Sequence, residues 1–330
     1  MNRFMCSVIA GGVVAVSAAV PAGAAAAPLP ESARAAVAAQ AAAVPAAART
    51  PAAAPRPLTG AATYLRSGDA AFEVLRHRPG RPWQTTSIAG AYANHQLTVS
   101  PDGAKAAWVG AGKLHVLTGL GSARPKDRVV ASDAAEAPCL TPVFSPDSTT
   151  VAYPRRAKQE ASVVVAVAAD GTGSRVLGKT RGVCHLAWSG AGRYLAGYAG
   201  TTEGVYLLDT RTGTSRRAKG IALANHVQSL SPDGRRVVVH RIGPKDPGGD
   251  GVWPSWFTPA IVDTRTGDRV AIPVRGSLLG ALYLRDGRLV VRVRGAKHNT
   301  LVIVGANGRI LQRMSEPARV REDALMAVTG

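Results

Sequence analysis

The sequence predicts an all-β fold, a six-bladed β-propeller in which each blade has four strands. Three observations predict it. A tight S-P-D-G turn recurs between apolar runs, a second series of glycine turns alternates with it, and the same order returns along most of the chain. The period is about 40–45 residues, and four strands in that length are the unit of a propeller blade.

The first turn series begins with S-P-D-G at 100–103. Pro101 presets φ, Asp102 can hydrogen-bond its own backbone, and Gly103 supplies a positive φ. Variants follow at 145–148, 189–192, 231–234 and 284–287, and their last positions lie 45, 44, 42 and 53 residues apart. We expect each of these turns to join the first and second strands of a blade.

The second turn series sets the number of blades. Its glycines are Gly80, Gly121, Gly173, Gly213, Gly267 and Gly308, and D-T-R-T-G at 209–213 returns letter for letter at 263–267. Six such turns indicate six blades, although only five have a first strand in sequence order. The first blade begins at its second strand, 61–66. We therefore expect the C-terminal strand 324–329 to join the first blade, close the ring and remove an exposed sheet edge.

S-P-D-G followed by an apolar strand resembles the WD-like repeats of TolB-type propeller proteins. The resemblance covers residues 59–330, with degenerate turns at S-G-A-G (189–192) and L-R-D-G (284–287). The α/β domain that precedes the propeller in TolB-type proteins has no counterpart in the length of this chain. The resemblance therefore implies a propeller alone, and the family's role in envelope import is not carried over.

Two segments precede the predicted propeller. Residues 1–26 are typical of a secretory signal peptide, with Arg3, an apolar run over 6–20 and an A-x-A motif at 22–24. An uncleaved membrane anchor is the alternative. Residues 27–58 are rich in Ala and Pro and favour a flexible linker. We expect an exported protein, extracellular or periplasmic, whose third segment, 59–330, is the propeller.

The charge of the chain is strongly basic. It has 40 Lys and Arg against 21 Asp and Glu, a formal charge of +19, of which +16 remains after the four basic residues and one acidic residue before position 59 are removed. Such a charge attracts polyanions at low salt, and outside a membrane these would be anionic cell-wall polymers. The alternative is Arg spread over solvent-exposed faces. The sequence has no dense basic run interleaved with aromatics, so we expect no nucleic-acid partner, and we expect a monomer.

Two cysteines remain beyond the signal peptide. Cys139 and Cys184 precede the turns at Ser145 and Ser189 by six and five residues, which places them at the start of the inner strands of neighbouring blades. Inner strands crowd around the channel of a propeller, and exported proteins meet oxidising conditions, so we predict a disulfide. Two buried free thiols or a soft-metal pair are the alternatives.

Candidate ligand-binding residues lie on the face that carries the irregular loops. The tripeptide A-N-H occurs at equivalent places in the second and fifth blades and contributes Asn94, His95, Asn225 and His226. We expect these side chains to line the channel mouth. Histidines are competent metal ligands, and the alternative is that they cap the inner strands and bind water.

The largest insertion lies on the same face. It spans 243–259 in the fifth blade and carries Trp253, Trp256 and Phe257 among prolines and glycines. Aromatic residues on a Pro-stiffened loop suit recognition of a protein, peptide or glycan. The alternative is a loop that folds its aromatics onto the edge of the blade.

Motifs of catalysis are missing from the sequence. It contains no G-x-S-x-G, H-E-x-x-H, P-loop, G-x-G-x-x-G or C-x-x-C. The sequence therefore predicts a non-enzymatic binding module with no cofactor, no catalytic residues and no metal. A metal-dependent hydrolase or lyase that uses the channel mouth is the alternative.

Overall fold

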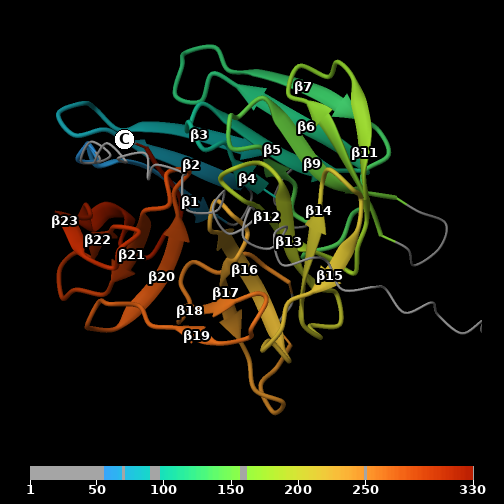
Figure 1. Ribbon diagram of the computed structural model, residues 1–330. Helices are drawn as coiled ribbons and strands as arrows, with labels where there is room; N and C mark the ends of the chain where they lie inside the picture. The colour runs from blue at the N-terminus through green and yellow to red at the C-terminus, as the bar shows by residue number, and fades with distance from the viewer. Residues whose placement is uncertain (1–55, 69–70, 90–96, 157–161, 249–250, 330) are drawn as a thin grey trace, which may run out of the picture. The chain divides into compact units, whose positions relative to one another are not determined.

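The computed structural model describes residues 56–68, 71–89, 97–156, 162–248 and 251–329. They form six four-stranded antiparallel sheets, which follow one another around a ring in chain order (Figure 1). The predicted six-bladed propeller is therefore confirmed. The predicted signal peptide at 1–26 and almost all of the linker at 27–58 lie outside the described residues.

Each blade has its innermost strand at the channel and its fourth strand at the outer edge of the ring. From the channel outwards, the first blade contains β24 (Ala324–Thr329), β1 (Ala61–Ser67), β2 (Ala71–His77) and β3 (Gln84–Ala89); the second β4 (Leu97–Val99), β5 (Lys105–Gly110), β6 (Lys113–Thr118) and β7 (Lys126–Ala131); the third β8 (Val143–Phe144), β9 (Thr150–Arg155), β10 (Val163–Ala168) and β11 (Ser174–Lys179). The fourth contains β12 (Gly182–Trp188), β13 (Tyr194–Ala199), β14 (Val205–Asp209) and β15 (Ser215–Arg217); the fifth β16 (Ala224–Leu230), β17 (Arg236–Arg241), β18 (Ala260–Asp263) and β19 (Arg269–Val270); the sixth β20 (Leu278–Tyr283), β21 (Leu289–Val293), β22 (Thr300–Val304) and β23 (Ile310–Ser315).

The C-terminal strand closes the ring as predicted. β24 pairs antiparallel with β1, with Ala61 opposite Thr329 and Leu65 opposite Ala324. A short 3-10 helix, η2 (Ala318–Val320), leads into β24 from the sixth blade. The first blade is therefore built from the two ends of the propeller, and the inner strands β24, β4, β8, β12, β16 and β20 succeed one another around the channel.

The S-P-D-G turns are held by their own side chains. The Ser100 hydroxyl donates to Asp102 Oδ1 (2.5 Å) and accepts the N–H of Lys105 (2.9 Å), while Asp102 accepts the N–H of Ala104 (2.9 Å). The same bonds recur around Ser145 with Asp147 and around Ser231 with Asp233. Serine and aspartate at this spacing are therefore a folding device, and each carboxylate is engaged within its own turn.

The repeated D-T-R-T-G turns are also stabilised by hydrogen bonds of their own side chains. Asp263 accepts the N–H groups of Arg265 and Thr266 (2.9 and 3.1 Å) and pairs with the Arg235 guanidinium (2.8 Å). These hydrogen bonds, the one from the Arg265 N–H foremost, lower the pKa of Asp263 to about 2. The Thr264 hydroxyl donates to the backbone oxygen of Gly234 (3.2 Å) and so ties this turn to the S-P-D-G turn beside it.

The hydrophobic core lies between neighbouring blades. Side chains of β5, β6, β9 and β10 form one cluster that joins the second and third blades, and β17, β18, β21 and β22 contribute to another between the fifth and sixth. Val, Leu, Ile and Ala dominate these clusters, as expected from a chain with 5% aromatic residues. Among the described residues no helix is long and apolar enough to span a membrane.

A buried ion pair holds the passage from the sixth blade to the first. Arg292 on β21 is 2% exposed and contacts Glu316, which is 1% exposed, with Nε and Nη2 at 3.0 and 2.8 Å. The same guanidinium donates to the backbone oxygens of Val320, Arg321 and Asp323, at 2.8, 3.0 and 2.6 Å. One cation therefore satisfies both a buried carboxylate and the carbonyls of the segment that turns into β24.

We predict that Arg292→Met destabilises the protein by about 3–5 kcal/mol, because it leaves the Glu316 carboxylate buried without its cation. Urea unfolding followed by far-UV circular dichroism measures this loss. The matched control is Arg294→Met, since Arg294 lies two residues further along and is a third exposed, and there the loss stays below about 1 kcal/mol. Equal losses in the two variants would contradict the assignment of Arg292 as the closing contact.

Candidate functional site

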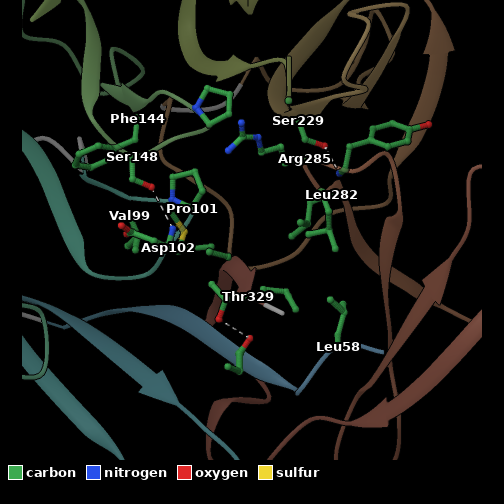
Figure 2. A pocket seen from close by; sticks show the side chains of 18 of the residues that line it. Leu58, Val99, Pro101, Asp102, Phe144, Ser148, Ser229, Leu282, Arg285 and Thr329 are labelled. Atoms are coloured by element: carbon green, nitrogen blue, oxygen red, sulfur yellow. Dashed lines mark hydrogen bonds between the residues drawn. The ribbon is translucent and has the colours of Figure 1, made fainter. Parts of the chain in front are cut away.

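A cavity with a volume of about 1490 Å³ occupies the central channel of the described structure. Figure 2 shows side chains from several blades around its open centre. Five inner strands contribute apolar side chains to the wall, among them Val99, Phe144, Leu186, Leu282 and Met326. The sixth, β16, contributes Gln228 and Ser229.

The channel opens on the face that carries the S-P-D-G turns. Pro101 and Asp102 of the second blade, Pro146 and Asp147 of the third, and Asp286 of the sixth line its mouth. The sequence favoured the opposite face, where the irregular loops lie, as the binding face. The cavity opens on the other face because, among the described residues, the short turns leave that end uncovered whereas a long loop covers the opposite end; which face binds a partner stays a prediction.

Arginines surround the mouth. The lining includes Arg56, Arg78, Arg81, Arg285 and Arg288. Arg288 pairs with Asp286 at 2.7 Å, and Figure 2 shows the Arg285 side chain extending into the opening. The mouth therefore has a net positive charge, because these five arginines outnumber its three carboxylates, Asp102, Asp147 and Asp286.

Trp253 closes the other end of the channel. It lines the cavity, and its ring centroid lies 4.6 Å from that of His226 and 5.1 Å from that of His185. It also packs against the apolar cluster of the first two blades, which contains Leu97 and Val99. The side chain thus contacts both sides of the ring, and the loop that carries it plugs the channel.

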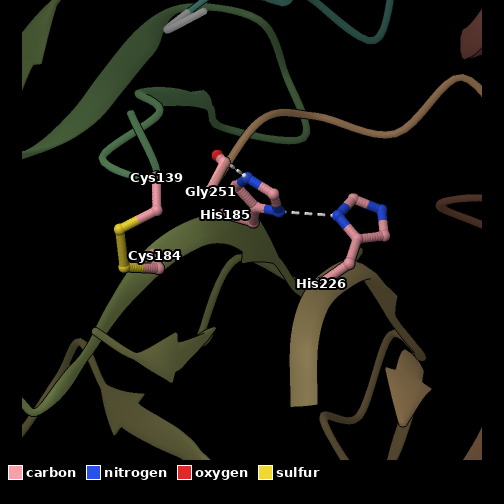
Figure 3. The surroundings of a disulfide bond; sticks show 5 residues. All are labelled: Cys139, Cys184, His185, His226 and Gly251. Carbon is pink, nitrogen blue, oxygen red and sulfur yellow. Dashed lines mark hydrogen bonds between the residues drawn. A yellow bond between two sulfur atoms is a disulfide. The ribbon is translucent and has the colours of Figure 1, made fainter. Parts of the chain in front are cut away.

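Two buried histidines support this plug. His185 Nδ1 lies 2.7 Å from His226 Nδ1, and His185 Nε2 lies 2.9 Å from the backbone oxygen of Gly251 (Figure 3). Since a carbonyl only accepts, His185 donates from Nε2. His226 Nε2 lies 2.7 Å from Gln228 Oε1, and because an amide oxygen only accepts, His226 donates from Nε2.

Burial keeps His226 neutral. Its side chain lies inside the protein, 1% exposed. Loss of hydration lowers the pKa of His226 well below its ordinary value, and the neighbouring His185 and His240 lower it further. The His226 imidazole is therefore uncharged at neutral pH, where it lies against His185 below the plug.

A disulfide lies beside the histidine pair. Cys139 and Cys184 are bonded, with their Cα atoms 4.7 Å apart (Figure 3). Cys184 lies in β12 as expected, whereas Cys139 precedes β8, which is only two residues long. Gly251 packs directly on this disulfide: its φ is +77°, and a Cβ there would lie 2.9 Å from Cys139 Cβ. The disulfide thus supports the start of the plug.

Only part of the predicted aromatic loop exposes its aromatic side chains to solvent. Phe257 is 4% exposed and its ring lies 4.7 Å from that of His226, so this side chain is buried as in the alternative of an inward-folded loop, and its role in binding stays a prediction. Trp253 faces the channel and not the solvent of the loop face. Trp256 alone is exposed, at 52%, with the Arg294 guanidinium 5.2 Å from its ring centroid. The aromatic rings turn inward because the channel end offers them a larger apolar surface.

The predicted A-N-H residues are placed differently. His226 is buried in the channel wall instead of lining an open mouth, and Asn225 is partly buried, with Oδ1 inaccessible to solvent. Asn94 and His95 lie outside the described residues, so their role as ligand-binding residues remains a prediction. The partner of His226 is a residue that the sequence did not single out.

His185 was missed because of a β-bulge. Comparison of the repeats aligned His226 with Cys184, five residues before the serine of its turn. In the structure the pairing of β12 with β13 shifts between Cys184 and Ala187, and His185 has a φ of +46°. This bulge turns His185 toward His226. A histidine one position from the aligned site was the only signal in the sequence.

The described residues contain no cluster of three or more His, Cys, Asp and Glu side chains suited to a metal. His185 and His226 could hold one only by exchanging the hydrogen bond between them for coordination. Gln228 would be their nearest further oxygen donor. The arrangement supports packing and ligand enclosure, and no group in it is paired as nucleophile with base.

Comparison with solved structures identifies the same fold elsewhere. TolB from Acinetobacter baumannii is 16% identical, with a TM-score of 0.50 over 83% of this chain and 68% of that one. A chain of the nidogen/laminin complex is 10% identical, with a TM-score of 0.50 over 82% and 97%. At these identities the likeness establishes the fold alone, and for the fold it confirms the resemblance to TolB-type propellers. No family model and no curated protein matches the chain.

We predict that stability falls below pH 6.5 because His226 is held neutral. In the unfolded chain His226 takes up a proton near pH 6.5. In the folded protein His226 resists protonation, so a falling pH stabilises the unfolded state relative to the folded one. Between pH 7.5 and 5.0 the free energy of unfolding falls by about 2 kcal/mol through this residue. Urea unfolding of wild type and His226→Gln measures it.

In this experiment the difference in the free energy of unfolding between wild type and His226→Gln becomes smaller as the pH falls. His298→Gln is the control, because His298 is exposed, and its curve stays parallel to that of wild type. A His226→Gln curve parallel to wild type over the whole range would show that His226 does not couple folding to protons.

Proposed function

We propose that this chain is an exported, non-enzymatic binding module whose ligand enters the central channel through the S-P-D-G face. The observation that carries the proposal is a cavity of about 1490 Å³ that is open at this face and plugged by Trp253 at the other. Ligand sites are typically concave and mostly apolar, with volumes of roughly 300–1,000 Å³. The channel is concave and larger than this range, so it accommodates a ligand of moderate size.

The walls of the channel favour a preformed site. Backbone pairing fixes each inner strand, and the turns of neighbouring blades are joined, as where the Asp102 N–H donates to Ser148 Oγ (3.2 Å). A rigid site loses little conformational entropy when it binds. This supports recognition by shape and charge without closure of a lid at the mouth.

Export is supported by two independent features. Residues 1–26 have the composition of a signal peptide. The disulfide between Cys139 and Cys184 suits an oxidising compartment. Partners of the module would then be proteins, peptides, glycans or anionic wall polymers outside the cytoplasmic membrane.

We predict that the neutral, solvent-sensitive dye Nile red binds the channel with a stoichiometry of one, because the wall is apolar. Fluorescence titration of the protein from residue 27 onward measures it. Met326→Trp fills the wall from β24 and lowers the affinity at least about tenfold. The control is Val176→Trp on β11, an outer strand, where Val176 is 55% exposed.

The variants separate a channel site from surface adsorption. Unchanged dye affinity in Met326→Trp, in a variant that melts as wild type does, would contradict the channel as the binding site. An equal loss of affinity in Val176→Trp would assign the dye to the outer surface.

We predict that the full chain, expressed in a bacterium with a Sec pathway, appears outside the cytoplasm with an N-terminus between residues 25 and 27. Intact-protein mass spectrometry of the fractions measures it. The double change Ala22→Leu with Ala24→Leu blocks cleavage, because signal peptidase requires small residues there. A cytoplasmic protein of full mass would contradict export, and a membrane-bound one of full mass would favour an uncleaved anchor.

A further inference from the structure

The mouth of the channel carries positive charge that the protein does not neutralise. Arg56, Arg78, Arg81 and Arg285 line the mouth, and no carboxylate of the described residues forms an ion pair with any of them. The carboxylates that share the mouth are already engaged. The Ser145 hydroxyl bond holds the pKa of Asp147 below its ordinary value, and Asp286 pairs with Arg288.

Arg285 is the best placed of these arginines. It occupies the second position of the turn 284–287, where the second, third and fifth blades have Pro101, Pro146 and Pro232 and the fourth has Gly190. A long cation therefore replaces a short apolar ring at one place around the mouth. Figure 2 shows its side chain reaching into the opening between Ser229 and the turn of the third blade. A guanidinium in this position binds carboxylate or phosphate through two parallel hydrogen bonds.

Below the charged mouth the wall becomes apolar. Val99, Phe144, Leu186, Leu282 and Met326 surround the channel, one from each of five inner strands. Hydrophobic burial stabilises an alkyl chain in such a wall, and each further methylene adds to the stabilisation. The channel therefore offers two environments in series, a cationic rim and an apolar shaft.

The shaft is closed at its far end. Trp253 contacts His226 on one side and the cluster that contains Val99 on the other. A ligand must therefore enter and leave by the same mouth, so an extended polymer cannot thread through the ring. A short molecule with one apolar end and one charged end satisfies both environments at once.

We propose that the channel binds a small amphiphilic anion, with its alkyl portion in the shaft and its carboxylate or phosphate on Arg285. This inference rests on the proposed function, since it names the ligand class of the same cavity. In this proposal the net positive charge of the mouth serves to bind the anionic headgroup of the ligand. The shared chemistry is that of an alkyl carboxylate and an alkyl phosphate, and separate probes distinguish the two.

The test is displacement of Nile red by four probes, each below its micelle-forming concentration. The probes are decanoate, decyl phosphate, decanol and acetate. Decanoate or decyl phosphate displaces the dye at concentrations at least about tenfold lower than decanol, since a charge-assisted bond contributes about 1.5–3 kcal/mol. Acetate, which has no chain for the shaft, displaces little. The tighter of the two anions identifies the headgroup.

Arg285→Gln separates charge recognition from general affinity for alkyl chains. In this variant the affinity for the anion falls about tenfold while that for decanol and Nile red stays unchanged. The matched control is Arg181→Gln, because Arg181 precedes β12 at the opposite end of the inner strands and its side chain is 66% exposed. There all affinities match those of wild type.

Each other outcome overturns the inference in a recognisable way. Equal affinity for decanoate and decanol, or equal loss of both in Arg285→Gln, would remove the anion site and leave the channel as a general binding cavity. Displacement by an apolar peptide with a free C-terminal carboxylate, but by neither alkyl anion, would assign the mouth to a protein partner. Failure of Nile red itself to bind would refute the proposed function, and not the ligand class alone.

Discussion

Ring closure by non-covalent contacts is the constraint on which the rest of this structure depends. The first blade takes β24 from one end of the propeller and β1, β2 and β3 from the other. The Arg292–Glu316 pair anchors the segment that brings β24 into place, and Arg66 joins the same segment through Asp323 at 2.8 Å. A channel with a defined wall exists only when all six inner strands are in position. The buried ion pair therefore matters for the binding cavity although it lies away from it.

The two ends of the channel differ in charge and in exposure to solvent. At the plugged end His226 is buried and held neutral, because an uncompensated charge there would be strongly destabilising. At the open end charge is retained on arginines that remain hydrated at the mouth. This asymmetry follows from the loops. The short S-P-D-G turns leave the mouth uncovered, whereas the insertion between β17 and β18 carries Trp253 across the other end.

The repeated turns explain why the fold was predictable and why they do not themselves mark a binding site. Ser100 and Asp102 hydrogen-bond within their turn, and Asp263 does the same in the second series. Such local bonds depend on residues two to five positions apart, so they are visible as spacing in the sequence. His226 was also visible, through the A-N-H tripeptide that recurs at equivalent places in two blades. Its partner His185 was not, since a β-bulge moved it by one position relative to the repeat. The direction in which the aromatic loop folds could not be predicted from the sequence either, because Trp253 packs against residues more than 150 positions away.

The sequence by itself determined the all-β class, the number of blades, the closing strand 324–329 and the pairing of turns, because all of these follow from periodic, short-range patterns. It also placed Cys139 and Cys184 in neighbouring blades, close enough to bond. Only the tertiary structure decided which face of the ring is open, which aromatics are buried and which arginines at the mouth lack a carboxylate partner. Those properties arise from contacts between blades that meet around the channel. Their residues are far apart in the chain, and no local pattern records where their side chains converge.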